Sequence, residues 1–386
     1  MRVGVISTVF PTKRNPAAGI YVKEELDSLT GHCEVRLIAP IANHHWFGES
    51  RSNAAHQNYP VVRPLTLGFP RWFMQRLYPS SMAVTLRLVG KSLFEGCDIV
   101  HAHNAFPEGG AAVKAFGGRF PVIITAHGSD LHLFAMKPNL RPGIVKALNS
   151  AKRIICVSSF LTKTLRMLGV TTKTVVIPNG IDVSFLTPGD KEQSSEFLGL
   201  EPDRARIIFA GNFFEVKGIE YLIQAMPAVL EKKPDCELIL LGARPDSSDR
   251  HRYKKNIDSA GVSHAIRIVD RMPHEEIPTW ISASDLLVLP SIREGFGLVA
   301  AEALACGRPV VATKSGGPED IVQECMGILV PTRDPESMAH AILKVFDGEG
   351  IMSPESLAES ARSRFSYEIV AGKILDVYNT VLREFA

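Results

Sequence analysis

The feature that most constrains the fold is a regular alternation of short apolar segments and helical stretches. Six strand candidates lie in the first half of the chain, at residues 3–7, 34–38, 99–102, 122–126, 153–157 and 174–177. Six more lie in the second half, at residues 207–210, 237–241, 266–269, 286–289, 309–312 and 328–330. Many are continuously apolar, which is typical of parallel strands buried on both faces. Two such series predict two doubly wound α/β sheets.

The turn residues Pro178-Asn179-Gly180-Ile181-Asp182 and the polar stretch after them predict a join between two domains. We expect an N-terminal domain over residues 1–183, a C-terminal domain over 184–365 and a final helical segment over 366–386, where apolar residues recur at helical spacing. The formal net charge of +2 gives no indication of nucleic-acid binding. Six cysteines without Cys-x-x-Cys spacing predict neither a zinc ribbon nor a disulfide framework, and they favour a cytoplasmic location.

Ligands of open α/β sheets bind beyond the carboxyl ends of the strands, and two glutamates follow one such end. Gly295 and Gly297 permit a tight turn, after which a helix of small residues is expected from Leu298. The first amide groups of that helix form an anion site suited to a diphosphate. Glu294 before the helix and Glu302 inside it can accept hydrogen bonds from sugar and ribose hydroxyls. The alternative is an alanine-rich packing helix with a solvated glutamate.

Glu294 and Glu302, with Pro-Ser before them and Cys-Gly-Arg-Pro-Val-Val-Ala-Thr after them, resemble the motif of the retaining group 1 / family 4 glycosyltransferases. The resemblance extends over nearly the whole chain. The Ser-Gly-Gly-Pro-Glu run at 315–319 is similar to the glycine loop of that family, and Asn-Gly-Ile-Asp at 179–182 is similar to its interdomain segment. The resemblance implies a GT-B fold, in which two Rossmann-like domains face a central cleft and the final helix crosses back to the N-terminal domain.

The resemblance also implies a donor site for a nucleotide diphosphate sugar. Lys217, which precedes glycine at a helix start, has the position of a phosphate ligand, and the resemblance assigns it to the diphosphate. Asn212 stands where the family often has arginine, and it supplies no charge. The expected donor-binding residues are Gly19, Asn212, Lys217, Arg271, Met272, Glu294, Gly295, Phe296, Gly297, Leu298 and Glu302.

Histidines follow two strands of the N-terminal half. His127 is catalytic by resemblance, together with Glu294, although a lone histidine is more often structural. His101 and His103 lie one residue apart, and no third metal ligand is evident around them. Because the chain also lacks an Asp-x-Asp pair, we expect transfer without a metal or a cofactor. The residues expected on the acceptor side are Phe10, Tyr21 and His103.

A basic stretch lies between residues 50 and 94, with six Arg or Lys and no Asp or Glu. It includes the aromatic run 69–78. Such a segment can rest on an anionic membrane, at the inner face of the plasma membrane, and admit a lipid-linked acceptor. The alternative is a helix packed on its own domain with a solvated basic face.

The resemblance predicts a retaining, metal-independent glycosyltransferase. It would move a hexose or N-acetylhexosamine from a UDP- or GDP-sugar to a hydroxyl of a saccharide or lipid-linked acceptor, by front-face transfer, in the assembly of a cell-surface polysaccharide or glycolipid. The alternatives are a sugar-nucleotide 2-epimerase and a non-catalytic scaffold of the same fold, because fold does not fix function.

Overall fold

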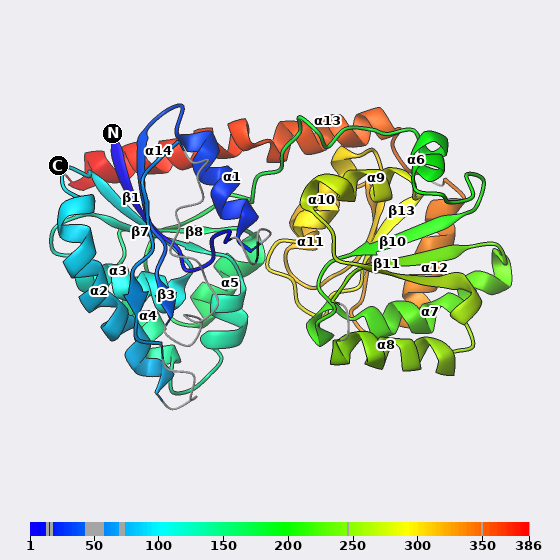
Figure 1. The fold of residues 1–386 in the computed structure, drawn as a ribbon, viewed down its shortest axis with the longest axis horizontal. Coiled ribbons are helices and arrows are strands. Elements are labelled where there is room, and N and C mark those ends of the chain that lie inside the picture. Colours follow the sequence, from blue (N-terminus) through cyan, green and yellow to red (C-terminus); the bar gives the residue numbers. More distant parts are fainter. Residues whose placement is uncertain are drawn as a thin grey trace. The chain divides into compact units, whose positions relative to one another are not determined.

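The computed structural model describes residues 1–12, 15, 18–42, 58–68, 74–244, 247–348 and 350–385. The chain forms two compact units (Figure 1). Unit 1 comprises Met1–Gly180 and Tyr367–Ala386, and unit 2 comprises Ile181–Ser366. The chain therefore passes from unit 1 to unit 2 after Gly180, slightly before the expected boundary at residue 183.

Unit 1 contains a seven-stranded parallel sheet in the order β4-β2-β1-β6-β7-β8-β9. The strands are β1 (Arg2–Ile6), β2 (Glu34–Ile38), β4 (Val61–Val62), β6 (Ile99–His103), β7 (Val122–Ala126), β8 (Arg153–Cys156) and β9 (Thr174–Val176). A separate pair joins β3 (Ile41–Ala42) to β5 (Leu65–Thr66). Strands β3, β4 and β5 were not predicted, because two residues are too few to show a periodic pattern.

Helices cover both faces of the unit 1 sheet. On one face, α1 (Ile20–Leu29) and α14 (Tyr367–Phe385) pack together over a core that includes Val3 and Val5. On the other, α2 (Tyr78–Leu93), α3 (Gly110–Phe116) and α4 (Arg141–Ser150) form a contiguous layer (Figure 1). The final helix thus belongs to unit 1, although the preceding 186 residues belong to unit 2.

Unit 2 contains a six-stranded parallel sheet in the order β12-β11-β10-β13-β14-β15. The strands are β10 (Arg206–Ala210), β11 (Glu237–Ala243), β12 (Ile266–Asp270), β13 (Leu286–Leu289), β14 (Val310–Thr313) and β15 (Gly327–Val330). Its main core lies under α7 (Ile219–Lys232), α8 (Ser248–Ser259) and α12 (Pro335–Phe346), while α10 (Leu298–Ala305) packs with α13 (Pro354–Phe365). The two predicted doubly wound sheets are confirmed.

The direction in which the chain adds strands reverses between β10 and β13, and between β1 and β6. Doubly wound sheets bind ligands at such switch points, so these strand ends are where a site is sought.

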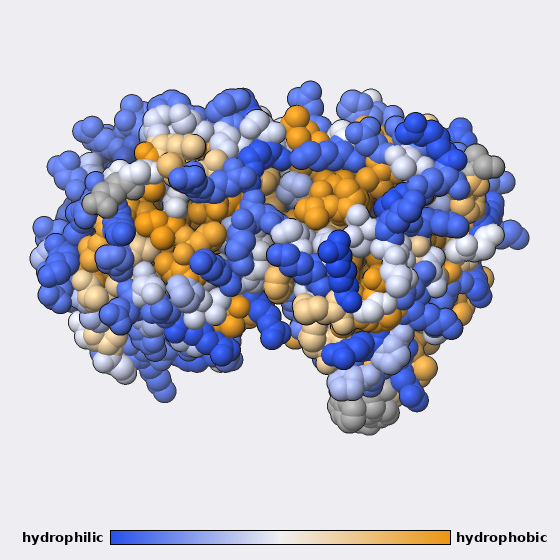
Figure 2. Space-filling view, turned by 180° about the vertical axis from the view of Figure 1, so that it is seen from behind, coloured by the Kyte–Doolittle hydropathy of each residue, from blue (hydrophilic) through white to orange (hydrophobic). Residues whose placement is uncertain are grey.

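Hydrophilic residues make up most of the face seen in Figure 2, and apolar residues gather there in separate patches. Among the residues that the structure describes, no helix has the length and apolar character required to cross a bilayer.

Candidate functional site

The candidate site in unit 2 begins with an ion pair at the switch point. Lys217 lies at the end of a short 3₁₀ turn (Glu215–Lys217) after β10, and Glu294 lies in the loop after β13. The Lys217 Nζ atom is 2.6 Å from Glu294 Oε2, and the Ser291 hydroxyl donates to the same oxygen at 2.9 Å. Because β10 and β13 are neighbours in the sheet, two residues 77 positions apart meet. Both side chains stay partly exposed, as ligand contact requires.

Backbone contacts hold the loops after β13 and β14 together. The Glu294 amide donates to the Ser315 carbonyl at 3.0 Å, and the Gly317 amide donates to the Glu294 carbonyl at 3.0 Å. A Cβ on Gly317 would lie 2.3 Å from the Phe296 carbonyl oxygen, so only glycine permits this approach. The glycine loop at 315–319 therefore fixes the backbone that carries Glu294.

Helix α10 starts next to this pair. Gly297, at φ +98°, precedes the helix in a left-handed conformation that favours glycine. The first turn of α10 carries no acidic residue, so its free amide groups and positive dipole end suit an anion. Gly295 and Leu298 are half-buried, whereas the Phe296 side chain is buried against Phe365. Phe296 can therefore offer a ligand its backbone rather than its ring.

Glu302, one turn further along α10, is buried and paired. Its Oε1 atom lies 2.7 Å from His274 Nε2, and the His274 ring packs edge-on against Phe185. His274 lies in a 3₁₀ turn (His274–Glu276) that follows β12. Within the structure, one oxygen of the carboxylate expected to hold a ribose is thus already engaged by a histidine.

The remaining expected donor residues lie at other strand ends of unit 2. Arg271 and Met272 follow β12, and the Arg271 amide donates to the Ala243 carbonyl at 2.8 Å. Their backbone therefore lies beside the end of β11. Asn212 is exposed in the loop after β10 and contributes no charge next to Lys217.

In unit 1, His127 follows β7 and contacts two of the expected acceptor-side residues. Its Nε2 atom lies 3.1 Å from His103 Nδ1, and its ring centroid is 5.0 Å from that of Tyr21. Loss of hydration lowers the pKa of His127 to about 4, so the imidazole is neutral near pH 7. Buried Asp130 accepts hydrogen bonds from the amides of Gly128 and Ala105, so it orients the loop that carries His127.

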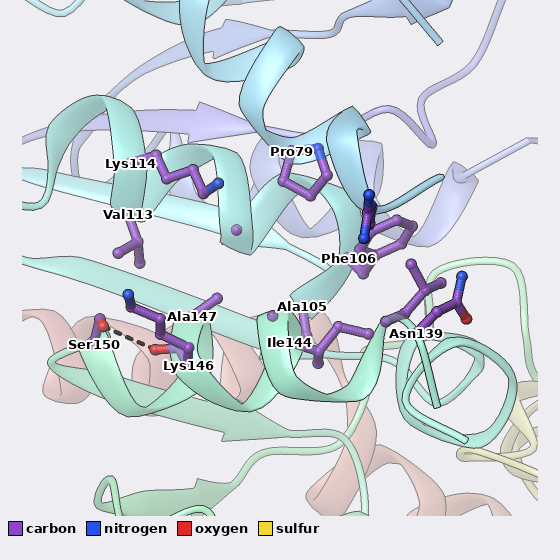
Figure 3. A pocket seen from close by; sticks show the side chains of 14 residues that line it. Pro79, Ala105, Phe106, Val113, Lys114, Asn139, Ile144, Lys146, Ala147 and Ser150 are labelled. Atoms are coloured by element: carbon purple, nitrogen blue, oxygen red, sulfur yellow. Dashed lines mark hydrogen bonds between the residues drawn. The ribbon is translucent and has the colours of Figure 1, made fainter. Parts of the chain in front are cut away.

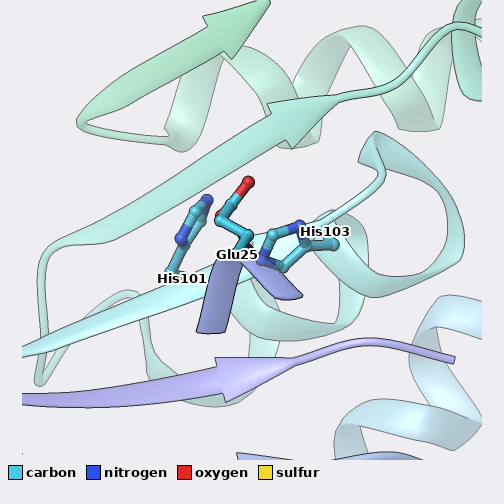
Figure 4. A group of neighbouring side chains, drawn as sticks. All are labelled: Glu25, His101 and His103. Carbon is cyan, nitrogen blue, oxygen red and sulfur yellow. Dashed lines mark ion pairs between the residues drawn. The ribbon is translucent and has the colours of Figure 1, made fainter. Parts of the chain in front are cut away.

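Glu25 joins the two histidines of β6 in a buried cluster (Figure 4). Its Oε1 atom is 3.7 Å from His103 Nε2. Both ring nitrogens of His101 are engaged, at 2.7 Å to the Tyr378 hydroxyl and at 2.7 Å to the Thr125 hydroxyl. Burial raises the pKa of Glu25 to about 8, which favours the protonated acid next to a neutral imidazole.

Glu25 is a third potential metal ligand that was not predicted, and the expected metal-free role of the two histidines stays a prediction. The ligand atoms of Glu25, His101 and His103 lie within 4.8 Å of one another. Because His101 already uses both nitrogens, a metal would have to displace one of its hydrogen bonds. A network of neutral side chains accounts for the geometry without an ion.

Two expected residues of the first loop have packing roles. The Phe10 side chain is buried in the core of unit 1, with the Arg63 guanidinium over its ring, and its expected acceptor-side role stays a prediction. Gly19 precedes α1 at φ +68°, where a Cβ would lie 2.2 Å from the Val9 carbonyl oxygen. This glycine lets the start of α1 pack directly on the backbone that follows β1.

The chain matches two known families in succession. Residues 18–185 match the family described as "Glycosyltransferase Family 4", and residues 190–364 match "Glycosyl transferases group 1". A glycosyltransferase of Methanocaldococcus jannaschii, named "Uncharacterized glycosyltransferase MJ1178", is 31% identical over 75% of this chain and 78% of its own length. This chain belongs to the group 1 glycosyltransferases.

Two other relatives of this glycosyltransferase match it over different shares of their own length. The "Putative teichuronic acid biosynthesis glycosyltransferase TuaC" of Bacillus subtilis is 26% identical over 99% of both chains. The "D-inositol 3-phosphate glycosyltransferase" of Segniliparus rotundus is 33% identical over 54% of this chain, and the matched part spans about half of that relative, 47%.

Solved structures show the same fold. Sucrose-phosphate synthase from Thermosynechococcus elongatus superposes with a TM-score of 0.83 over all of both chains at 22% identity. Anabaena HepE, solved in complex with UDP, superposes with a TM-score of 0.76 over 98% of this chain and 99% of its own at 20% identity. The glycosyltransferase therefore has the GT-B fold.

Three residues of this glycosyltransferase besides Glu25 were not predicted from the sequence. His274 and Ser291 contact the two expected glutamates, and both lie within four residues after a strand, which was the available signal. Glu108 had no such signal. It is buried, accepts a hydrogen bond from the Thr8 amide at 3.0 Å and also contacts the Thr8 hydroxyl. Burial raises the pKa of Glu108 to about 7.

Proposed function

We propose that this glycosyltransferase moves a hexose or N-acetylhexosamine from a UDP- or GDP-sugar to a hydroxyl of a saccharide or lipid-linked acceptor. The observation that carries the proposal is the Lys217–Glu294 pair at the switch point of unit 2, next to the acid-free start of α10. It combines a cation and helix amides for a diphosphate with a carboxylate for sugar hydroxyls.

In this proposal, binding of the donor breaks the Lys217–Glu294 ion pair. The diphosphate takes the Lys217 ammonium and the first amides of α10, which releases Glu294 to accept hydrogen bonds from the sugar. Ser291 keeps one oxygen of Glu294 oriented during the exchange. Glu302, steadied by His274, receives the ribose hydroxyls with its other oxygen.

We propose retention by front-face transfer, in which the leaving diphosphate accepts the proton of the attacking hydroxyl. The buried carboxyls of unit 1 support this choice. Burial raises the pKa of Glu25 to about 8 and that of Glu108 to about 7, so near pH 7 Glu25 is mostly protonated and Glu108 is about half protonated, and a protonated acid is a poor nucleophile. His127 acts in its neutral form, as an acceptor rather than a cation.

We also propose that a divalent metal is not needed. Lys217 and the α10 amides supply the positive charge that a metal would bring to the diphosphate. The cluster of Glu25 and two histidines is held by its own hydrogen bonds and is not assigned to the donor.

The test is a melting-temperature screen of the protein with UDP, GDP, ADP and their hexose and N-acetylhexosamine conjugates, with and without EDTA. A ligand at a hundred times its Kd stabilises the native state by about 2.7 kcal/mol. One nucleotide should give a clear shift that Lys217→Met reduces to about half and that EDTA leaves unchanged. Lys232→Met is the matched control, because that lysine is exposed at the far end of α7.

Other outcomes favour the alternatives. No shift with any nucleotide at millimolar concentration contradicts the donor site and favours a scaffold. Conversion of a nucleotide sugar to its 2-epimer without any acceptor, detected by NMR of the sugar protons, favours an epimerase. A shift that EDTA abolishes contradicts metal independence.

A further inference from the structure

Unit 1 contains a cavity of ≈ 260 Å³ on the sheet face covered by α2, α3 and α4, and Figure 3 shows the side chains that line it. Its apolar wall includes Pro79 at the start of α2, Phe106 after β6, Val113 on α3, and Ile144 and Ala147 on α4. The volume is slightly below the range of about 300–1,000 Å³ that is usual for small-molecule sites. An apolar space of this size can hold one hydrocarbon chain but is too small for a larger apolar group.

Three cations line the cavity, and its lining includes no acid. Arg76, Lys114 and Lys146 all line it and are exposed. In Figure 3, Lys114 and Lys146 lie near one end and Phe106 near the other. Lys114 Nζ donates to the Ser80 hydroxyl at 2.6 Å, and an ammonium has two further protons to give. Among the described residues, none of the three cations forms an ion pair.

The exposed face of α2 continues from the rim of this cavity. The Arg87 guanidinium donates to the Lys114 carbonyl, so α2 and the Lys114 edge are in contact. Next to Arg87, the side chains of Val84 and Leu88 are 57% and 75% exposed, and Leu77 is 44% exposed on the same helical face. An apolar stripe flanked by Arg and Lys is typical of a surface that lies at a membrane interface.

We propose that this cavity binds one hydrocarbon chain of an anionic membrane lipid. The chain lies against Phe106 and Ile144, and the lipid phosphate binds at the end of the cavity that carries Lys114 and Lys146. The stripe on α2 meets the bilayer surface from which the lipid is drawn. The site belongs to unit 1 and is independent of the donor chemistry of unit 2.

Gly143 offers a way to close the cavity without disturbing the helix that carries it. It lies in α4, lines the cavity and has nothing within 4 Å of an added Cβ. Leucine favours helix more than glycine does, so Gly143→Leu should fold. Gly372→Leu is the matched control, because Gly372 is an exposed residue of α14 that also has nothing within 4 Å.

The experiment measures co-sedimentation of the protein with vesicles of phosphatidylglycerol and phosphatidylcholine, and with phosphatidylcholine alone. The wild type should bind the anionic vesicles, and Gly143→Leu should bind them roughly tenfold more weakly, since excluding about two methylene groups has that effect. Gly372→Leu should match the wild type. Nucleotide-induced melting shifts should be the same in all three, which separates this test from the donor site.

Three results would overturn the proposal. The first is absence of binding to anionic vesicles, and the second is equal binding by Gly143→Leu and the wild type. The third comes from melting temperatures measured with inorganic phosphate and with dodecyl phosphate, and it is a shift with inorganic phosphate as large as that with dodecyl phosphate. That third result would indicate a site that binds the phosphate group alone, without a hydrocarbon chain. If Gly143→Leu does not fold, Lys146→Glu takes its place, because Lys146 is exposed on α4 and its charge reversal should weaken binding to the anionic vesicles.

Discussion

Replacing Lys217 should weaken nucleotide binding, whereas replacing its partner Glu294 should strengthen it. A charge-assisted hydrogen bond contributes about 1.5–3 kcal/mol. The Lys217 side chain is 24% exposed, so we expect its hydrogen bond to the diphosphate to contribute a free energy at the lower end of that range. Lys217→Met should therefore weaken binding of the nucleoside diphosphate by about tenfold, because the diphosphate loses its ammonium partner.

Glu294→Gln should strengthen binding of the same nucleoside diphosphate. In the free protein, Glu294 holds the Lys217 ammonium at 2.6 Å, and the diphosphate must displace it. A partly exposed ion pair contributes about 0.2–1 kcal/mol, so releasing it should tighten binding by up to about fivefold. The sugar-bearing donor should gain less or bind more weakly, because it loses the carboxylate that accepts its hydroxyls.

Isothermal titration calorimetry of the wild type, both single variants and the double variant measures these changes as a double-mutant cycle. The double variant should bind the nucleoside diphosphate like Lys217→Met, because the Glu294 carboxylate affects this binding only by competing with the diphosphate for the Lys217 ammonium. Equal weakening by both single variants would refute the reasoning, since it would mean that Glu294 itself contacts the nucleotide. Lys232→Met should bind like the wild type.

Three further predictions concern stability. Gly317→Ala should destabilise the protein by about 1–3 kcal/mol in urea unfolding and weaken nucleotide binding, because its Cβ would lie 2.3 Å from the Phe296 carbonyl oxygen. Arg206→Met should cost about 3 kcal/mol in urea unfolding, because it removes the buried 3.2 Å partner of Glu237 and leaves the Ala283 carbonyl without its guanidinium donor, while only the half-exposed Arg267 still pairs with Glu237. Glu25→Gln should raise the melting temperature by an amount that grows between about pH 5 and 8, because burial raises the pKa of Glu25 to about 8 and the unfolded acid releases its proton near pH 4.5.

Matched variants test each cause. Gly118→Ala should leave stability unchanged, since nothing lies within 4 Å of its added Cβ. Arg267→Met should cost less than about 1 kcal/mol, because that arginine pairs with the same glutamate from a half-exposed position. A melting-temperature difference between wild type and Glu25→Gln that stays constant with pH would contradict a raised pKa.

The strand positions of both sheets could be predicted from the sequence because each is a local property. The segment 286–289, for example, is the observed β13, and its apolar residues are buried on both faces. The helix at Leu298 and the glutamates around it also follow from local signals, namely glycine before a helix and acids after a strand. Strands of two residues, such as β4, carry no pattern of that length.

Which side chains meet was decided by the tertiary structure. Lys217 contacts Glu294 because β10 and β13 are adjacent in the sheet, an order that no local pattern specifies. His101 contacts Tyr378 across 277 residues, because the final helix belongs to unit 1. The sequence by itself determined where strands, helices and the acidic loop lie, whereas strand order and helix packing brought distant residues together, because those contacts depend on burial in three dimensions rather than on neighbours in the chain.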